Sequence, residues 1–200
     1  MMLYLHGFRS SPASFKSQML ARVFAEQGLS DHWRCPQLPA SPHEALQQSL
    51  ALAHELMTAT GKPAHELTVT GSSLGGFYAI AVAERLGCRA VLLNPAVFAA
   101  RDLATQVGEH TMYHSDEPMV FKSAYVDELA AMAVASITRP ERYLLIAATG
   151  DEVLDWREMV SFMAGAHHLI VPGSDHGLSD FATHMPRVLA FAGVPTPRED

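Results

Sequence analysis

The serine at position 73 has the sequence surroundings of a nucleophile. It lies in GSSLGG (residues 71–76), between the apolar run LTVT and the apolar, helix-favouring run FYAIAVAERL. This is the GxSxG pattern of a sharp strand-to-helix turn, in which a strained backbone leaves no room for side chains two positions before and after the serine. Gly71 and Gly75 meet that requirement. The spacing therefore predicts Ser73 as the nucleophile.

Two other interpretations of this motif are weaker. If Ser72 were the nucleophile, Thr70 and Leu74 would occupy the crowded positions. A phosphate-binding loop would need the lysine and the spacing of a P-loop, which the segment lacks. A plain glycine- and serine-rich turn before a helix stays open as an alternative.

A serine hydroxyl needs a base, and in α/β-hydrolase sequences an acid and then a histidine follow the serine. Asp151 comes after the apolar run YLLIAA, and His176 comes after HLIV. Both are predicted to lie just past strand ends, so we expect them to act with Ser73. The alternatives are that Asp151 only caps a helix and that His176 is an ordinary loop residue. Asp155, in the same motif TGDEVLDW, lies about one helical turn farther from the shared edge.

An oxyanion hole needs two backbone N–H donors. One belongs to the residue after the nucleophile, here Leu74, and the other to a loop after an earlier strand, for which Phe8 is the candidate. His6 and Gly7 precede Phe8. We expect Gly7 to allow close backbone approach, and His6 to support the loop by a hydrogen bond rather than to transfer a proton.

The eleven histidines do not form a metal-binding pattern. There is no HExxH motif, and His110 and His114 are four positions apart in a polar segment. The neighbours His167 and His168 would point to opposite faces of a strand. We therefore expect neither a metal nor a cofactor.

Short β-rich runs alternate with longer runs of helical period, which predicts a parallel sheet with helices on both faces. The predicted strands are 2–5, 67–70, 90–93, 143–148 and 168–171, with a further short strand at 33–38. The predicted helices are 14–27, 43–59, 74–86, 153–163 and 178–191.

Residues 99–139 interrupt this alternation. No β-rich run is expected there, because the centre, GEHTMYHSDEP, is polar and turn-rich and the following ELAAMAVASI is apolar. We expect a cap-like insertion in a single α/β domain spanning 1–200, since insertions at the ligand-binding edge of such sheets commonly cover the crevice. The final residues, VPTPRED, are expected to fray.

Composition narrows the class of protein. A chain of 200 residues with 48% hydrophobic side chains suits one folded domain rather than a disordered chain. A formal net charge of −7 disfavours nucleic acid and anionic membranes as partners. Cys35 and Cys88 form neither a disulfide framework nor a zinc site, and no leader-like start or membrane-length apolar run is present. We expect a soluble cytoplasmic protein.

With these motifs the chain resembles the YqiA/YcfP-like family of small bacterial esterases in the α/β-hydrolase superfamily. The resemblance rests on LYLHGFRSSPASFKS, GSSLGGFYA, LLNPAV, TGDEVLDW and GSDHGLSDF, which together span almost the whole chain. It implies an α/β-hydrolase fold with about six to seven strands, cytoplasmic residence, and hydrolysis of carboxylic esters or thioesters without a cofactor. Residue by residue it supports Ser73, Asp151 and His176.

The predicted reaction is hydrolysis of a small-molecule ester or thioester through an acyl-enzyme on Ser73. An acyltransferase or peptidase with the same residues, or a catalytically silent binding module, stays open, because such residues fix neither the acyl donor nor the acceptor. A long-acyl site would need apolar side chains around Ser73. The candidates for that role are Phe8, Phe77, Phe98, Met112 and Met119.

Overall fold

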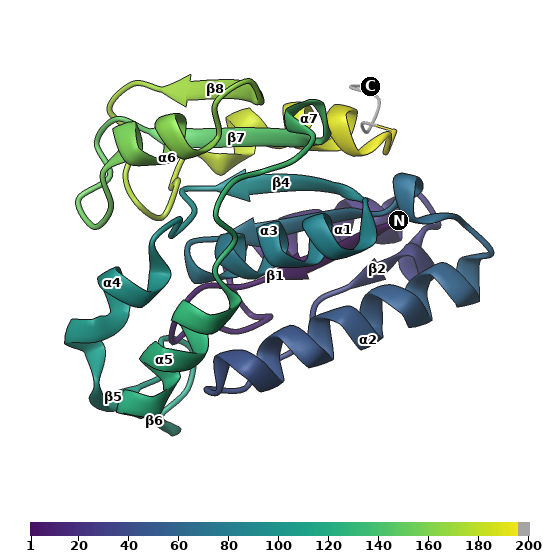
Figure 1. Cartoon of the computed structure of the whole chain (residues 1–200). Coiled ribbons are helices and arrows are strands. Elements are labelled where there is room, and N and C mark those ends of the chain that lie inside the picture. The colour runs from purple at the N-terminus through teal and green to yellow at the C-terminus, as the bar shows by residue number, and fades with distance from the viewer. Residues whose placement is uncertain (196–200) are drawn as a thin grey trace.

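A six-stranded parallel sheet forms the centre of the protein in the computed structural model, which describes residues 1–195 (Figure 1). The strands lie in the order β2-β1-β3-β4-β7-β8. In chain order they are β1 (Met2–Leu5), β2 (Trp33–Arg34), β3 (Thr68–Ser72), β4 (Arg89–Leu93), β7 (Tyr143–Ala148) and β8 (His167–Val171). The predicted parallel α/β fold is confirmed. The predicted fraying of the chain end falls mostly on residues 196–200, which lie outside the described residues.

Helices pack on both faces of this sheet (Figure 1). One face carries α1 (Phe15–Glu26) and α7 (Phe181–Ala192), and the other carries α2 (Pro42–Thr60), α3 (Leu74–Leu86) and α6 (Trp156–Phe162). Short 3₁₀ turns join several elements: η1 (Ser30–His32), η2 (Ala64–Glu66), η3 (Ala104–Gln106) and η4 (Pro140–Arg142). Successive side chains of a strand point to opposite faces, so Leu144 and Ile146 of β7 pack with α1 and α7 while Leu145 packs with α2 and α3.

The strand order reverses between β1 and β3. From β1 the chain moves outward to β2, and it then returns to the other side of β1 for the remaining strands. Ligands bind open parallel sheets at the carboxyl ends of the strands where the order reverses, because neighbouring loops diverge there. The loops that follow β1 and β3 meet at this point, which brings Phe8 and Ser73 to one edge of the sheet.

Three predicted elements have an end that differs from the structure by three residues or more. The helices expected from 153 and from 178 begin only at Trp156 and Phe181. Leu178 has a φ of 50°, which a right-handed helix cannot contain, and Asp155 has an extended backbone and caps α6, so the helix begins after it. The strand expected at 33–38 ends at Arg34, and farther on the backbone N–H of Leu38 donates to a side chain instead of a neighbouring strand.

The prediction that no strand interrupts residues 99–139 was wrong. Between α4 (Ala99–Leu103) and α5 (Ser123–Met132) lies an antiparallel hairpin of β5 (Gly108–Thr111) and β6 (Pro118–Phe121). Of its eight residues only Phe121 is buried. Because the hairpin contributes so little to the core, its sequence lacks the strong apolar alternation that reveals a strand.

Candidate active site

Ser73 occupies the turn between β3 and α3. Its backbone angles are φ 54° and ψ −120°, which lie in a region that residues other than glycine rarely adopt. The Ser73 N–H donates to the Leu93 carbonyl, and the Ser73 carbonyl accepts from the N–H groups of Gly76 and Ala96. These three bonds, to β4, to α3 and to the loop after β4, hold the strained residue in place.

The glycines beside Ser73 are where the backbone comes closest to itself. A Cβ on Gly71 would lie 2.1 Å from the Gly75 carbonyl oxygen, and one on Gly75 would lie 2.0 Å from the Leu5 carbonyl oxygen. A Cβ on Gly76 would lie 2.6 Å from the Pro95 Cβ. Because these positions have no side chains, the turn can close on itself at Gly71, rest against β1 at Gly75 and pack on Pro95 at Gly76.

His176 lies between Ser73 and Asp151. Its Nε2 is 3.0 Å from the Ser73 Oγ, and its Nδ1 is 2.8 Å from the Asp151 Oδ2. An ionised carboxylate can only accept, so Nδ1 carries the hydrogen and Nε2 is left to accept from the serine hydroxyl. The Asp151 side chain is completely buried, and its Oδ1 accepts from the N–H groups of Val153 and Leu154, each at 2.8 Å.

Asp155, the alternative acid of the same motif, lies elsewhere. It is the N-cap of α6, and its Oδ1 accepts from the Arg157 N–H at 2.9 Å. Its side chain is half exposed and forms no hydrogen bond with His176. The geometry therefore brings Asp151, and not Asp155, to the histidine.

Sequence reasoning missed the residues that fix the loop carrying His176. Asn94, fully buried at the end of β4, donates from Nδ2 to the carbonyls of Asp175 and His176, and its Oδ1 accepts from the Ala148 N–H. The Glu152 carboxylate accepts from the His176 N–H at 3.0 Å. The sequence signal that could have found Asn94 is a single amide side chain inside the apolar run VLLNPAV.

The loop after β1 supplies the residues predicted beside the oxyanion. His6 is buried and does not reach Ser73: its Nε2 accepts from the Leu38 N–H, and its Nδ1 lies 3.0 Å from the Gly7 carbonyl. Burial lowers the pKa of His6, which favours the neutral ring. A Cβ on Gly7 would lie 3.2 Å from the Ser73 Cβ, so the loop rests directly on the serine.

A cavity of about 540 Å³ opens at this edge, lined by residues that include Ser73, His176, Phe8 and Leu74. The backbone N–H groups of Phe8 and Leu74 have no acceptor within residues 1–195. Two unpaired donors beside a serine hydroxyl are what a developing oxyanion requires. The arrangement can chemically support nucleophilic attack on a carbonyl.

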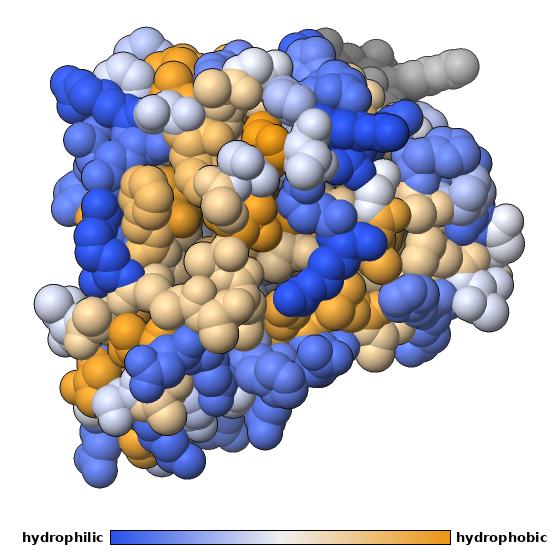
Figure 2. Space-filling view, in the orientation of Figure 1, coloured by the Kyte–Doolittle hydropathy of each residue, from blue (hydrophilic) through white to orange (hydrophobic). Residues whose placement is uncertain are grey.

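Of the five apolar residues considered for a long-acyl site, Phe8 alone lines this cavity in the described part of the chain. Phe77 and Phe98 line a separate apolar groove, over α4, α5 and α6, on the face shown in Figure 2. Met112 and Met119 line a separate small space together with His6 and Phe8.

Within residues 1–195, no three His, Cys, Asp or Glu side chains are grouped so that they could hold a metal ion. None of the helices in that part of the chain combines the length and the apolar character needed to span a membrane.

Comparison with known proteins finds related sequences over nearly the whole chain. The sequence profile of the family described as Uncharacterised protein family (UPF0227) matches residues 1–193. A UPF0227 protein from Pectobacterium carotovorum is 25% identical over 195 residues, covering 96% of this chain and 98% of that protein. An acetyl-hydrolase from Streptomyces hygroscopicus is 27% identical over 208 residues, covering 100% of this chain but only 64% of that protein.

Solved structures with this fold include α/β hydrolases. The structure of the metagenome-derived lipolytic enzymes LipS and LipT matches with a TM-score of 0.69 and 19% identity, covering 96% of this chain and 92% of that chain. The esterase domain of a Rhodothermus marinus protein matches with a TM-score of 0.64 and 22% identity, covering 94% and 83%. At these identities the likeness establishes the α/β-hydrolase fold.

Replacing Gly71 should destabilise the protein severely. The new methyl group of Gly71→Ala would collide with backbone, which cannot move aside as a side chain can, so we expect a loss of more than about 3 kcal/mol in the free energy of unfolding. Gly61→Ala is the control. A methyl group at Gly61 would meet open space, so the substitution should cost only the strain of its positive φ, about 1 kcal/mol. Urea unfolding of both variants measures the difference, and equal losses would contradict the proposed collision.

Removing the Asn94 side chain should loosen the His176 loop. Asn94→Ala breaks three hydrogen bonds and leaves the buried Ala148 N–H unpaired, which should cost about 2 kcal/mol or more. Because Asn94 has a φ of 43°, alanine adds backbone strain, and Asn94→Gly serves as the control without it. Thermal unfolding of both variants is the measurement. Wild-type stability in Asn94→Gly would show that the three bonds contribute nothing.

Proposed function

The chain belongs to the uncharacterised protein family UPF0227, and on that premise we propose that it is a serine hydrolase that cleaves small carboxylic esters or thioesters. The family match confirms the resemblance that the motifs indicated. The observation that carries the proposal is the hydrogen-bonded series of Ser73, His176 and Asp151 at the cavity. Acyl transfer needs a nucleophile, a base in contact with it, and an acid that orients the base.

In the proposed mechanism the Ser73 Oγ attacks the substrate carbonyl while His176 Nε2 takes the hydroxyl proton. The tetrahedral intermediate collapses, and the imidazolium gives that proton to the leaving alcohol or thiol. Water, deprotonated by the same nitrogen, then attacks the acyl-enzyme and releases the acid. Asp151 holds the ring in the correct tautomer and stabilises its positive charge, a role supported by the burial of its carboxylate.

The proposed oxyanion hole consists of the backbone N–H groups of Phe8 and Leu74. Its support is that both donors lack protein acceptors and both residues line the cavity. In comparable sites, removal of one donor costs roughly 2.7 to 4 kcal/mol of transition-state stabilisation. Because these donors are backbone groups, the side chains at the two positions matter less than the path of the loops.

Ester hydrolysis is favoured by the relatives. An acetyl-hydrolase, lipolytic enzymes and an esterase domain are among the similar proteins. The cavity can accommodate an acyl group, because the apolar side chains of Leu103, Val153 and Leu154 line it together with Phe8. We place the enzyme in the cytoplasm, where the free thiols of Cys35 and Cys88 would remain reduced.

We further propose that residues 99–139 form a cap over the cavity within a single α/β-hydrolase domain. Leu103 and Tyr113 from this segment line the cavity. Tyr113 also joins the segment to the first loop, since its N–H donates to the Arg9 carbonyl and its ring lies 4.5 Å from the Arg9 guanidinium. A segment attached in this way can shape which substrates enter.

Ser73→Ala should abolish turnover of a short p-nitrophenyl ester, by roughly 10⁵-fold or more. It should also abolish labelling by a fluorophosphonate probe, because within residues 1–195 no other hydroxyl is bonded to His176. Ser72→Ala is the matched control, since it changes the adjacent hydroxyl, and it should keep most of the activity. Unlabelled but folded wild-type protein would favour a silent binding module. Parallel assays of thioesters, amides and acyl acceptors would distinguish the other enzyme classes.

Asp151→Asn should lower turnover by up to about 10⁴-fold, because an amide at this position no longer selects the tautomer with a free Nε2. Asp155→Asn should leave turnover nearly unchanged, since asparagine and aspartate cap helices almost equally well. Turnover and melting temperature are measured for both. An active Asp151→Asn beside an inactive, folded Asp155→Asn would move the acid to Asp155.

A further inference from the structure

The first turn of α1 faces the cavity that contains Ser73. Ser10, Ser14 and Lys16 all line this cavity. Helix α1 has no acidic residue in its first turn. Backbone N–H groups there have no acceptor inside the helix, and the helix dipole gives this end a partial positive charge. The cavity wall at α1 is therefore electropositive.

Ser14 is the N-cap of α1 but does not act as a cap. Its side chain makes no capping bond, and its hydroxyl is buried without a hydrogen-bond partner within residues 1–195. The residue is only 8% exposed. A serine at this position normally accepts from a helix N–H, and a buried hydroxyl without a partner is costly. Tyr4, whose hydroxyl interacts with the side chains of Ser14 and Ser72, lines the same cavity. Ser14 therefore belongs to a cluster of hydroxyl groups on the cavity wall, which can donate to an anion.

Lys16 adds a full positive charge to the same wall. It is 6% exposed, and its ammonium donates to the Gly177 carbonyl. It forms no ion pair with a carboxylate of the described residues. Burial lowers the pKa of Lys16 to about 8, against the opposing effect of the charge on Asp175. The ammonium still carries its proton at pH 7, with donors that the protein leaves unused.

The other charged group of the cavity does not compensate Lys16. Asp102 also lines the cavity, but its Oδ1 accepts from the Arg101 guanidinium at 2.8 Å. The Asp175 carboxylate acts on Lys16 without forming an ion pair with it, and its Oδ1 accepts from the Ser179 N–H. A ligand that entered from solvent would therefore meet the carboxylate of Asp102 already paired with Arg101, and an ammonium that has no carboxylate in direct contact. This difference favours an anionic ligand at the α1 end.

We propose that Lys16, the Ser14 hydroxyl and the first turn of α1 bind an anionic group of the substrate, so that the enzyme prefers esters that carry a carboxylate. This inference rests on the proposed esterase function. A carboxylate would accept charge-assisted hydrogen bonds from Lys16 and a bond from Ser14, which replaces the hydration both groups lose on burial. The carboxylate could belong to the acyl part of the ester or to its leaving group.

The test compares matched neutral and anionic esters in wild type and Lys16→Met. p-Nitrophenyl hemisuccinate against p-nitrophenyl pentanoate places the charge on the acyl part. 4-Acetoxybenzoate against its methyl ester places it on the leaving group. In one of the two pairs, Lys16→Met should lower kcat/KM for the anionic ester about tenfold or more, mainly through KM, and change the neutral ester by less than about twofold.

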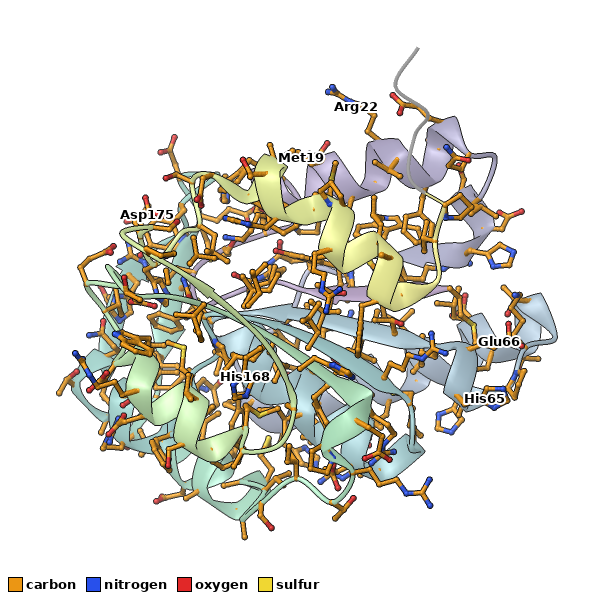
Figure 3. The ribbon with its side chains drawn as sticks, turned by 90° about the horizontal axis from the view of Figure 1, so that it is seen from above. Met19, Arg22, His65, Glu66, His168 and Asp175 are labelled. Carbon is orange, nitrogen blue, oxygen red and sulfur yellow. The ribbon has the colours of Figure 1, made fainter. Side chains whose placement is uncertain are left out.

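Arg22→Met is the matched control. Arg22 is on the same helix but exposed, and it points away from the protein (Figure 3). The substitution removes one positive charge, as Lys16→Met does, without touching the cavity, so both esters of each pair should react as in wild type. Ser14→Ala keeps the charge and should give a smaller loss that is again confined to the anionic ester.

Two outcomes would overturn the proposal. Equal losses of kcat on neutral and anionic esters would show that Lys16 positions the His176 loop through Gly177, and an unchanged ratio in every pair would show that it recognises nothing. Binding of monomethyl succinate to the Ser73→Ala protein, measured by calorimetry with and without Lys16→Met, separates this question from catalysis. Lys16-dependent binding in a protein that cleaves no ester would refute the esterase and keep the anion site. Ester hydrolysis that does not depend on Lys16 would instead keep the esterase and refute the anion site.

Discussion

The close approach of the β3–α3 turn to β1 is the contact on which the site depends. A hydrogen in place of a Cβ at Gly75 lets the turn rest against the Leu5 carbonyl, and Gly71 allows the turn to close on itself. Only this compact backbone holds Ser73 at its positive φ, a conformation that costs about 1–3 kcal/mol. The buried length of α3 offsets that cost and keeps the serine at the edge of the sheet, where its hydroxyl meets His176.

The order of the strands explains why the histidine loop needs support from outside itself. Ser73 follows β3, whereas His176 follows β8 at the far edge of the sheet, with β4 and β7 between them. The loop must therefore extend across the ends of two strands to reach the serine. Asn94, at the end of β4, binds two carbonyls of the loop and one N–H of β7. The Asn94 side chain thus connects β4 and β7 to the loop that carries His176 across their ends.

The parts of this structure that could be predicted are those whose cause is local. Glycines two positions from Ser73 indicate backbone crowding, and continuous apolar runs indicate strands buried on both faces, so the elbow and the parallel sheet follow from the sequence. Asn94 and Lys16 could not be assigned in this way, because their partners lie 81 and 161 positions away and no spacing rule relates them. The hairpin of residues 108–121 was not predicted for another reason. Its strands are mostly exposed, so they lack the pattern of apolar residues by which a strand is recognised in a sequence.

Two buried charges flank the histidine loop, and the protein treats them differently. The Asp151 carboxylate accepts three hydrogen bonds, from His176 and from two backbone N–H groups, so its burial is compensated within the fold. The Lys16 ammonium has one carbonyl acceptor, and its lowered pKa reflects the remaining desolvation. An apolar side chain of similar length at position 16 would avoid that penalty. Buried polar groups that the protein does not fully compensate tend to occur at functional sites. The difference between these two charges therefore favours Lys16 as the group to which a substrate would supply the missing hydrogen-bond acceptor.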